Sequence, residues 1–477
     1  MNDFKKSENV KRIAVVGAGD AAKRFVETIQ SSKELLSQYD LVYIFDDNLS
    51  KVNSKFCGIQ VIDVIKNLAN YKNDFDKIII AIPSARRDQF NVIYNYCLNA
   101  HKEILTIPSL KEILDKSKSI TSVRDIDMKD LINRQEIEID YKEISKIVRD
   151  KTILITGGAG SIGSVILKLC LSGKAKKIIC IDNSEYNTYK LLNSLDDKRL
   201  IYKISDIRDK KMMNLYFNKY KPGIVFHAAA FKHVNLQEDN IRDCLLTNFF
   251  GTQNILSIVD KYSVDKFVLI STDKAVEPSN SMGFSKRMAE LLVSYYSNFS
   301  KTKMSIVRFG NVIGSSGSVL IRFSKLIKNR EDITVTHPKV KRYFMSIEEA
   351  CYLVISSINE VKNNYQIFMI DMGEEILIDE IAKTLIKING LELGKDININ
   401  YSKLSRGEKI SEKLNYSFEQ KKVLDSNKII RLDSSKTINH RTFDRFISEL
   451  HEMIYKIDKT SNSSIVAHLK KYFKGLV

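Results

Sequence analysis

One arrangement of apolar and polar positions occurs twice along the chain. In each copy an apolar, strand-like run leads into a glycine turn, a helical pattern follows, and a second apolar run ends in an acidic residue. The first copy spans residues 12–47, with its helical part reaching about Leu36, and the second spans residues 151–182. Strands that alternate with helices in this way form parallel sheets with helices on both faces. The sequence therefore predicts two doubly wound α/β domains.

The rest of the pattern divides the chain into three parts. Further strands, each next to a helical pattern, are expected at residues 223–228, 267–271 and 304–308. From about Ser315 the alternation gives way to mixed helix and short strand, which indicates a small C-terminal lobe that binds substrate. Residues 119–150 are polar and charged. We therefore expect a Rossmann-like N-terminal domain at 1–118, a linker at 119–150 and a catalytic domain at 151–477.

Composition places the chain among globular proteins. Its 477 residues are too many for one small domain, and apolar and charged fractions of 44% and 28% are typical of a folded chain. The apolar runs fall short of the roughly 20 residues that a membrane helix needs. No apolar core of a secretory signal follows the N-terminus. We expect a cytoplasmic protein.

The cysteine spacing and the charge distribution limit which metals, macromolecules and small molecules the chain is expected to bind. The six cysteines are scattered without a C-x-x-C pair, which favours reduced, mostly buried thiols over a metal site or disulfides. The net charge of +17 is spread along the whole chain and no basic tract is interleaved with aromatic residues. This pattern favours a solvated lysine-rich surface, or attraction of a small anionic substrate, over nucleic-acid binding.

The second glycine turn is suited to a dinucleotide. Its spacing, G-x-x-G-x-x-G at 157–163, is the form seen in extended short-chain dehydrogenases. Glycines let the backbone approach a pyrophosphate, and the helix that starts there supplies unpaired N–H groups. Asp182, at the end of the next strand, is placed to bond the adenosine ribose hydroxyls. Asn183 and Ser184 follow where a 2′-phosphate would require an Arg, so we predict NAD rather than NADP.

The first glycine turn, Gly17-Ala-Gly19 with Ala22, is a weaker signal. Such a motif often survives in domains that bind nothing firmly. Regulatory or vestigial nucleotide binding and simple packing of helix on strand both account for it, and no catalytic role is assigned to it.

Residues 267–286 carry the reacting groups. A buried strand ends in Ser-Thr272-Asp273-Lys274, which brings a hydroxyl, an acid and an amine to the carboxyl edge of the sheet, where ligands bind in this fold. Lys286 lies four residues after Met282, on the same face of the next helix. In short-chain dehydrogenases this spacing is Tyr-x-x-x-Lys. A thioether cannot transfer a proton, so Met282 argues against an ordinary alcohol dehydrogenase.

The chain resembles a specific family over nearly its whole length: the long-chain nucleotide-sugar 4,6-dehydratases of bacterial surface-glycan biosynthesis, known as UDP-N-acetylglucosamine 4,6-dehydratases. Members with Met in place of the Tyr form a long branch of this family. The matching stretches are 81–84, 107–109, 156–163, 227–234, 271–278, 282–286, 334–338, 342–345 and 407–409. The resemblance implies a hydro-lyase that converts a UDP-N-acetylhexosamine into the UDP-4-keto-6-deoxy sugar, with retention at carbon 5 suggested by the branch.

The resemblance also implies roles for the residues that match its motifs. Thr272 would bond the oxygen on carbon 4. Asp273 would protonate the departing hydroxyl on carbon 6. The sequence does not identify the group that accepts the first hydroxyl proton, and our hypothesis is Asp273 acting through a water. Lys274 would take the proton from carbon 5, and Lys286 would hold the nicotinamide ribose. The expected cofactor-binding residues are Gly157, Gly160, Ser161, Ile162, Gly163, Asp182, Ser184, Asp206, Ile207, Ala228, Ala229, Ala230, Asn248 and Lys286.

Candidate substrate contacts follow from the same motifs. They are Lys232, His233, Asn311, Thr334, Arg342 and Glu408. A lone His such as His233 is more often structural, and Arg342 suits either a diphosphate or a structural ion pair.

Two departures from the family and two rival functions stay open. The branch commonly carries membrane helices ahead of its soluble part, and this chain begins where they would end; a protein with such helices would sit at the inner face of the membrane. The family's Arg-Pro-Gly-Glu-Lys motif reads Ser405-Arg-Gly-Glu-Lys409. A nucleotide-sugar 4-epimerase and a non-catalytic nucleotide sensor are the rivals. A homo-oligomer is expected.

Overall fold

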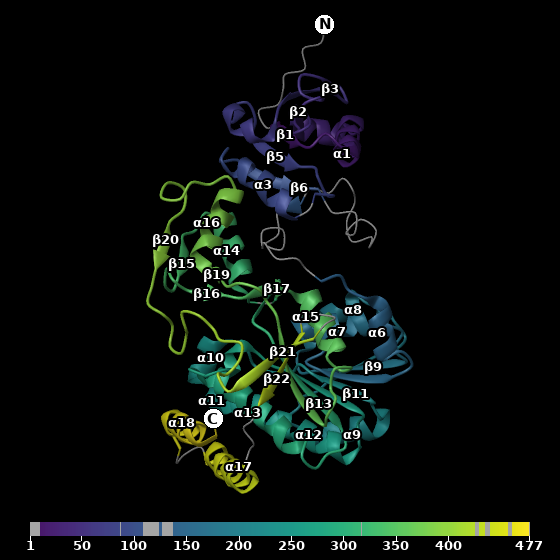
Figure 1. Ribbon diagram of the computed structural model, residues 1–477, viewed down its shortest axis with the longest axis vertical. Helices are drawn as coiled ribbons and strands as arrows, with labels where there is room; N and C mark the ends of the chain where they lie inside the picture. Colours follow the sequence, from purple (N-terminus) through teal and green to yellow (C-terminus); the bar gives the residue numbers. More distant parts are fainter. Residues whose placement is uncertain are drawn as a thin grey trace. The chain divides into compact units, whose positions relative to one another are not determined.

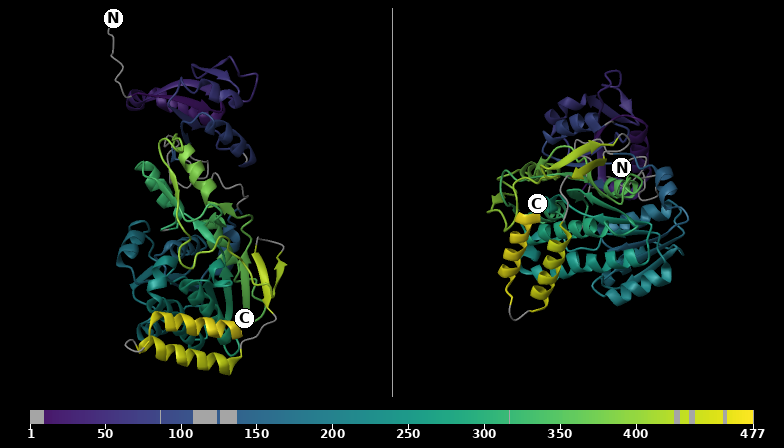
Figure 2. Two further views of the ribbon diagram at one scale, coloured as in Figure 1. Left: turned by 90° about the vertical axis from the view of Figure 1, so that its left-hand side faces the viewer. Right: turned by 60° about the horizontal axis from the view of Figure 1, so that its bottom comes forward.

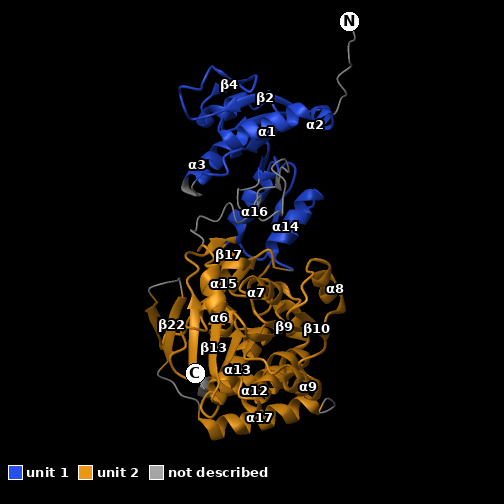
Figure 3. Cartoon of the chain, turned by 90° about the vertical axis from the view of Figure 1, so that its right-hand side faces the viewer, with its two compact units in different colours: residues 1–135, 317–338, 378–402 blue, residues 136–316, 339–377, 403–477 orange. Residues whose placement is uncertain are grey.

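The computed structural model describes residues 10–85, 87–107, 124–125, 137–315, 317–424, 429–434, 439–456 and 460–476, which Figure 1 and Figure 2 show coloured along the sequence. Half of the expected linker, residues 119–123 and 126–136, lies outside these residues. The chain separates into two compact units, each discontinuous in sequence (Figure 3). The first unit comprises residues 1–135, 317–338 and 378–402, and the second comprises 136–316, 339–377 and 403–477.

The predicted domain boundaries at residues 118 and 150 stay a prediction. The two compact units divide the chain at other positions. Two segments expected in the catalytic domain, 317–338 and 378–402, fall in the first unit. Short parallel strands join these two segments to each other. The elements are α14 (Val319–Lys328), β15 (Ile333–Val335), α16 (Ile378–Ile388) and β20 (Ile399–Tyr401).

The N-terminal part of the first unit is a seven-stranded sheet in the order β3-β4-β2-β1-β5-β6-β7. Its central strands are parallel, as the alternating pattern predicts. The helical stretch expected to Leu36 is interrupted at Ser32, whose backbone is extended and whose hydroxyl accepts a bond from Leu35 N. The elements are β1 (Lys11–Val16), α1 (Asp20–Ser31), α2 (Lys33–Gln38), β2 (Tyr39–Phe45), β3 (Lys55–Phe56), β4 (Ile59–Asp63), η1 (Ile65–Tyr71), β5 (Lys77–Ile80), α3 (Arg87–Leu98), β6 (Glu103–Thr106) and β7 (Arg124–Asp125).

The second unit contains a nine-stranded sheet in the order β10-β9-β8-β11-β12-β13-β18-β22-β21. The first seven strands are parallel, and β22 and β21 are antiparallel. Because β8 lies between β9 and β11, the strand order reverses there, and ligands bind at such a point. The strands are β8 (Thr152–Thr156), β9 (Lys177–Asp182), β10 (Leu200–Ile204), β11 (Ile224–His227), β12 (Lys266–Ile270), β13 (Lys303–Arg308), β18 (Tyr365–Ile370), β21 (Glu419–Val423) and β22 (Ile429–Ser434).

Helices and short strands complete the second unit. Two short two-stranded sheets are separate from the nine-stranded sheet. In one of them β14 pairs with β17 in parallel, and in the other β16 pairs with β19 in the antiparallel direction. The elements are α6 (Tyr141–Val148), α7 (Ser161–Ser172), α8 (Glu185–Asn193), α9 (Lys210–Tyr220), α10 (Val234–Asp239), α11 (Ile241–Leu245), η2 (Leu246–Gly251), α12 (Thr252–Lys261), η3 (Asp273–Ala275), α13 (Ser281–Tyr296), β14 (Asn311–Ile313), β16 (Lys341–Arg342), β17 (Phe344–Ser346), α15 (Ile347–Ser356), β19 (Ile376–Leu377), α17 (His440–Tyr455) and α18 (Asn462–Leu476).

The sequence correctly places β11, β12 and β13, and the end of the chain adds more to this unit than the pattern suggests. Strands β18, β22 and β21 extend the catalytic sheet, and α17 and α18 lie side by side, in yellow in Figure 2. Aromatic side chains of this pair join the core, with Phe446 against Phe249 and Phe473 against Phe284. Helix α13 is buried at every residue from Ser281 to Val293.

The structure bears on two further expectations, the burial of the cysteines and the lack of membrane-spanning helices. All six cysteines are free in the structure and five are buried, as expected, and their reduced state stays a prediction. Within the described ranges, no helix combines the length and apolar character needed to cross a membrane.

A fully buried charge network joins α13 to the sheet. The Arg308 guanidinium, at the end of β13, donates two bonds to the Glu290 carboxylate of α13, at 2.7 and 2.8 Å, and a third to Glu419 of β21 at 2.8 Å. Arg287 and the Ser271 hydroxyl also donate to Glu290. Burial raises the pKa of Glu290, but Arg308 outweighs burial and lowers this pKa to about 2. The carboxylate is therefore ionised and paired.

We expect Arg308→Met to destabilise the fold by about 3–5 kcal/mol, because it leaves two buried carboxylates without their main partner. Urea unfolding followed by circular dichroism measures the change. Arg445→Met is the matched control, since Arg445 forms an ion pair with Glu449 within one exposed helix face. The control should leave the unfolding midpoint nearly unchanged, and equal effects of the two substitutions would contradict the assignment.

Candidate active site

The glycine turn after β8 is closed tightly enough to exclude side chains. Gly157 has φ +63°, and a Cβ there would lie 2.7 Å from the backbone of Ala229. A Cβ on Gly163 would overlap the carbonyl oxygen of Gly157. Helix α7 starts at Ser161, and its N-cap, Gly160, offers no side-chain hydrogen bond to the first turn. The first N–H groups of α7 and the partial positive charge of its N-terminus are thus suited to a diphosphate.

Asp182 is fixed beside this turn. One of its carboxylate oxygens accepts a bond from Ala159 N at 3.0 Å, and the other accepts one from Ser184 N at 2.9 Å. The Ser184 hydroxyl caps α8. Two further predicted cofactor residues follow β10: Asp206 is bonded to Arg208 at 2.7 Å, and Ile207 is buried. The structure therefore brings the glycine turn together with the Asp182 carboxylate that is predicted to bind the ribose.

Two buried residues hold the segment that follows β11. His227 lies between the hydroxyls of Thr156 and Thr252, at 2.6 and 2.9 Å. Burial lowers the pKa of His227 to about 3, so its ring is neutral. Asn248 bonds both the N–H and the carbonyl of Phe231 and donates to the Ser285 hydroxyl. Asn248 thereby connects residues 228–231 to α13, and its predicted contact with the cofactor stays a prediction.

Thr272, Asp273 and Lys274 form one cluster at the carboxyl end of β12. Oδ1 of Asp273 accepts bonds from the Thr272 hydroxyl at 2.8 Å and from the Lys274 amine at 3.0 Å. The amine also donates to Asn311 Oδ1 at 3.3 Å. Asp273 is fully buried, and among the described residues its Oδ2 has no hydrogen-bond partner. The acid, the amine and the hydroxyl are thus within bonding distance of one another.

Met282 and Lys286 lie on the buried first turns of α13. Lys286 Nζ donates to the carbonyl of Ile270, the last residue of β12, at 2.6 Å. Burial lowers the pKa of Lys286 from 10.5 to about 8, and the Glu290 carboxylate partly offsets this effect. Met282 is 3% exposed. The helix and the strand end that carry the candidate groups are therefore bonded to each other.

The predicted substrate contacts are distributed over several elements. Asn311 is part of the cluster, as described above. Arg342 pairs with Glu408 at 3.1 Å, and whether it contacts a diphosphate or only forms this ion pair stays open. Lys232 and His233 follow β11, and His233 is the N-cap of α10. Thr334 lies on β15 in the first unit, so its role stays a prediction.

The first unit repeats the local geometry of the cofactor turn. Ala18 N donates to Asp46 Oδ2 at 2.6 Å and Asn48 N to Asp46 Oδ1 at 2.9 Å, as Ala159 and Ser184 do to Asp182. A pocket of about 500 Å³ lies at this sheet edge. Its lining comprises Asp46, Asp47, Ile65, Ile82, Ser84, Ala85, Gln89, Val92 and Ile93. Nucleotide binding and simple packing both remain compatible with this turn.

Sequence reasoning gave no role to several residues that shape the site. His227 and Tyr343 stand in matched motifs, which was the available signal. Burial raises the pKa of Tyr343, and the charges of Glu375 and Asp273 add to this shift. Glu290, Arg308 and Glu419 carry no local signature, because their partners are 18 and 111 residues apart.

We expect Lys286→Met to stabilise the nucleotide-free protein below pH 8 while abolishing turnover. The pKa of Lys286 is lower in the folded state than in the unfolded state, so a protonated Lys286 disfavours folding. This penalty is present below pH 8 and disappears as the pH rises toward 10.5. Unfolding in urea at pH 7 and pH 10 measures the difference. A gain that does not shrink at pH 10, or a less stable variant at pH 7, would refute the interpretation.

Comparisons with known proteins assign most of the chain. The family model described as "Polysaccharide biosynthesis protein" matches residues 153–434, and the "PglD N-terminal domain" model matches residues 12–91. The probable polysaccharide biosynthesis protein EpsC of Bacillus subtilis is 35% identical, over 93% of this chain and 74% of the relative.

Shorter relatives match the catalytic part. A UDP-N-acetylglucosamine 4,6-dehydratase (inverting) of Campylobacter jejuni is 31% identical over 61% of this chain and 87% of the relative. The X-ray structure of Pen from Bacillus thuringiensis is 31% identical, covers 61% of this chain and 89% of its own, and superposes with a TM-score of 0.55. These matches confirm the predicted extended short-chain dehydrogenase fold. The chain belongs to the polysaccharide biosynthesis protein family that its catalytic part matches.

Proposed function

We propose that the chain is an NAD-dependent hydro-lyase that converts a UDP-N-acetylhexosamine, with UDP-N-acetylglucosamine as the first choice, into the UDP-4-keto-6-deoxy sugar for bacterial glycan synthesis. The observation that carries this proposal is the Thr272-Asp273-Lys274 cluster, bonded together at a strand end that Lys286 also contacts. Retention at carbon 5 is part of the proposal. A cytoplasmic location and a homo-oligomer remain predictions.

The glycine turn and its neighbours fit NAD. A side chain at Gly157 or Gly163 would fill the cradle, and Asp182 stands where a ribose diol would be bonded. The N–H groups at the start of α7 would hold the diphosphate, and Lys286 the nicotinamide ribose. NAD, when bound, accepts a hydride from carbon 4 and returns it to carbon 6. The protein has to orient the sugar and move protons.

The cluster is arranged for proton transfer. Thr272 would bond the oxygen on carbon 4. The Lys274 amine would take the proton from carbon 5, which the neighbouring ketone acidifies, and would return a proton to carbon 5 once the hydride has reached carbon 6. Asp273 would accept the proton of the carbon 4 hydroxyl through a water and then pass a proton to the hydroxyl on carbon 6, which leaves as water. Oδ2 of Asp273, which is buried and has no hydrogen-bond partner within the part of the chain that the structure describes, is the oxygen that we assign to this transfer.

A nucleotide-sugar 4-epimerase is the alternative. Relatives named UDP-glucose 4-epimerase occur in Rickettsia. An epimerase of this fold relies on the Tyr that Met282 replaces, whereas elimination needs an acid and a base of the kind that Asp273 and Lys274 provide. A sensor without activity is disfavoured, because the groups for elimination are all present and in contact.

We expect UDP-N-acetylglucosamine, incubated with the protein in deuterated water, to yield a product that has lost one water and carries one deuterium on carbon 5. Mass spectrometry gives the water loss, and proton NMR gives the label and the configuration at carbon 5. A product of unchanged mass identifies an epimerase. Inverted configuration at carbon 5 would contradict retention alone.

We expect Lys274→Ala to lower turnover by about 10³-fold, because general acid–base groups typically contribute 10²–10⁴-fold. The variant should still bind the nucleotide, since Lys274 contacts Asp273 and Asn311 and lies outside the glycine turn. Lys422→Met, at an exposed lysine of β21, is the control. Turnover of Lys274→Ala close to that of the control would show that Lys274 is not the base.

A further inference from the structure

Residues 405–413, which we call the strap, bind the loop at residues 275–280. This loop joins the helical turn that carries Asp273 and Lys274 to α13, which carries Met282 and Lys286. Glu277, in the middle of the loop, has φ +43°, a conformation that a residue with a side chain rarely adopts. Such a loop needs contacts from elsewhere to hold its shape.

Gly407 supplies the first of these contacts. Its carbonyl accepts bonds from the Ser279 hydroxyl at 2.8 Å and from Asn280 Nδ2 at 3.0 Å. Asn280 also caps α13 by accepting a bond from Gly283 N. Gly407 has φ +75°, and a Cβ there would lie 2.5 Å from the Cβ of Asn280. The strap can approach the start of α13 this closely only with glycine at 407.

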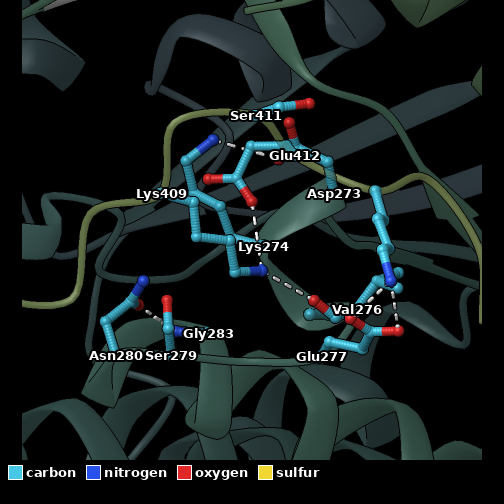
Figure 4. A network of polar contacts seen from close by, with 12 residues as sticks. Asp273, Lys274, Val276, Glu277, Ser279, Asn280, Gly283, Lys409, Ser411 and Glu412 are labelled. Atoms are coloured by element: carbon cyan, nitrogen blue, oxygen red, sulfur yellow. Dashed lines mark hydrogen bonds and ion pairs between the residues drawn. The ribbon is translucent and has the colours of Figure 1, made fainter. Parts of the chain in front are cut away.

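Lys409 supplies the second contact (Figure 4). Its amine donates to the carbonyl of Val276 at 2.9 Å and pairs with the Glu412 carboxylate at 3.2 Å. Glu412 is 4% exposed, so loss of the amine would leave a buried acid without its cation. Lys413 pairs with Glu277 at 2.9 Å. Two consecutive loop residues are therefore held by two strap lysines.

The strap is itself anchored at both ends. Glu375 accepts bonds from the Ser411 hydroxyl and from Glu412 N. At the other end Arg406 pairs with Glu238, which accepts a bond from Ser281 N, the first residue of α13. The strap is therefore bonded at both ends to residues outside the loop.

We propose that Lys409 is a positioning residue: by holding the Val276 carbonyl, it fixes the loop between Lys274 and α13 and so aligns both with the sugar. This inference rests on the proposed dehydratase function and names how its active site is kept in shape. In this proposal the Lys409 amine of the Gly407-Glu408-Lys409 motif binds a backbone carbonyl of the protein itself. The other role open to a lysine in this motif is direct binding of the substrate diphosphate.

The test compares Lys409→Met, Lys409→Arg and Lys422→Met in the full chain. We expect Lys409→Met to lower kcat about 10- to 100-fold with KM for UDP-N-acetylglucosamine changed less than threefold, because misalignment affects the reacting geometry. Lys409→Arg, which keeps a donor and a charge, should recover most of kcat. Amide hydrogen exchange of peptides covering 275–283 should be faster in Lys409→Met and normal in Lys422→Met.

Each other outcome overturns the proposal or points elsewhere. A rise in KM with kcat unchanged would make Lys409 a substrate contact, and unchanged exchange at 275–283 would show that the strap does not hold the loop. If Lys409→Met does not fold, Gly407→Ala, which pushes the strap away from Asn280, must give the same exchange result. If the wild-type chain turns over no UDP-hexose, the proposed function fails, whereas the exchange measurement still decides the role of Lys409.

Discussion

The buried pair of Glu290 and Arg308 is the interaction on which the catalytic geometry depends. A charge in a protein interior is tolerated only when its partners satisfy it, and here each partner comes from a different element: α13, the ends of β12 and β13, and β21. Ser271, which donates to Glu290, directly precedes Thr272. Lys286 makes a second connection one turn earlier on α13, to Ile270. These contacts therefore favour one position of α13 relative to the end of β12. The cluster of Thr272, Asp273 and Lys274, which follows β12 directly, is fixed in the same way.

The parts of the site that the sequence predicts are those encoded locally. A glycine turn between strand and helix, and a polar tripeptide after an apolar strand, each place their groups by backbone rules alone, so the turn at 157–163 and the cluster at 272–274 could be found in advance. Asn311 could be found only from its motif. Pairing of Arg308 with Glu419, or of Lys409 with Val276, depends on how distant segments meet, and neither residue carries a pattern that names its partner. The same limit applies to β18, β22 and β21.

The two glycine turns show why a motif alone does not establish binding. Each turn has the same pair of backbone bonds to an aspartate, at Asp46 and at Asp182, so these bonds follow from the strand–turn–helix fold. The turns differ in what surrounds them. In the first unit Lys51 donates to the Ala18 carbonyl and lies 3.7 Å from Asp46. In the second unit, by contrast, the turn shares its sheet edge with the cluster of Asp273 and Lys274. Chemistry at the neighbouring strand ends, rather than the turn, distinguishes the catalytic unit.

The buried titratable groups beneath the site divide into fixed and adjustable ones. His227 is neutral and Glu290 is ionised over the whole range from about pH 4 to pH 9, because their pKa values are displaced to about 3 and about 2. The electrostatic field that they impose on the strand ends therefore does not change with pH in that range. Lys286, with a pKa of about 8, is different: a modest change in its surroundings alters its charge. Ribose hydroxyl oxygens that accept bonds from the amine would favour its protonated form, whereas the positive charge of an oxidised nicotinamide ring would oppose it. Cofactor binding and the charge of Lys286 would therefore be thermodynamically linked, with a sign that depends on which of these two groups lies nearer to the amine.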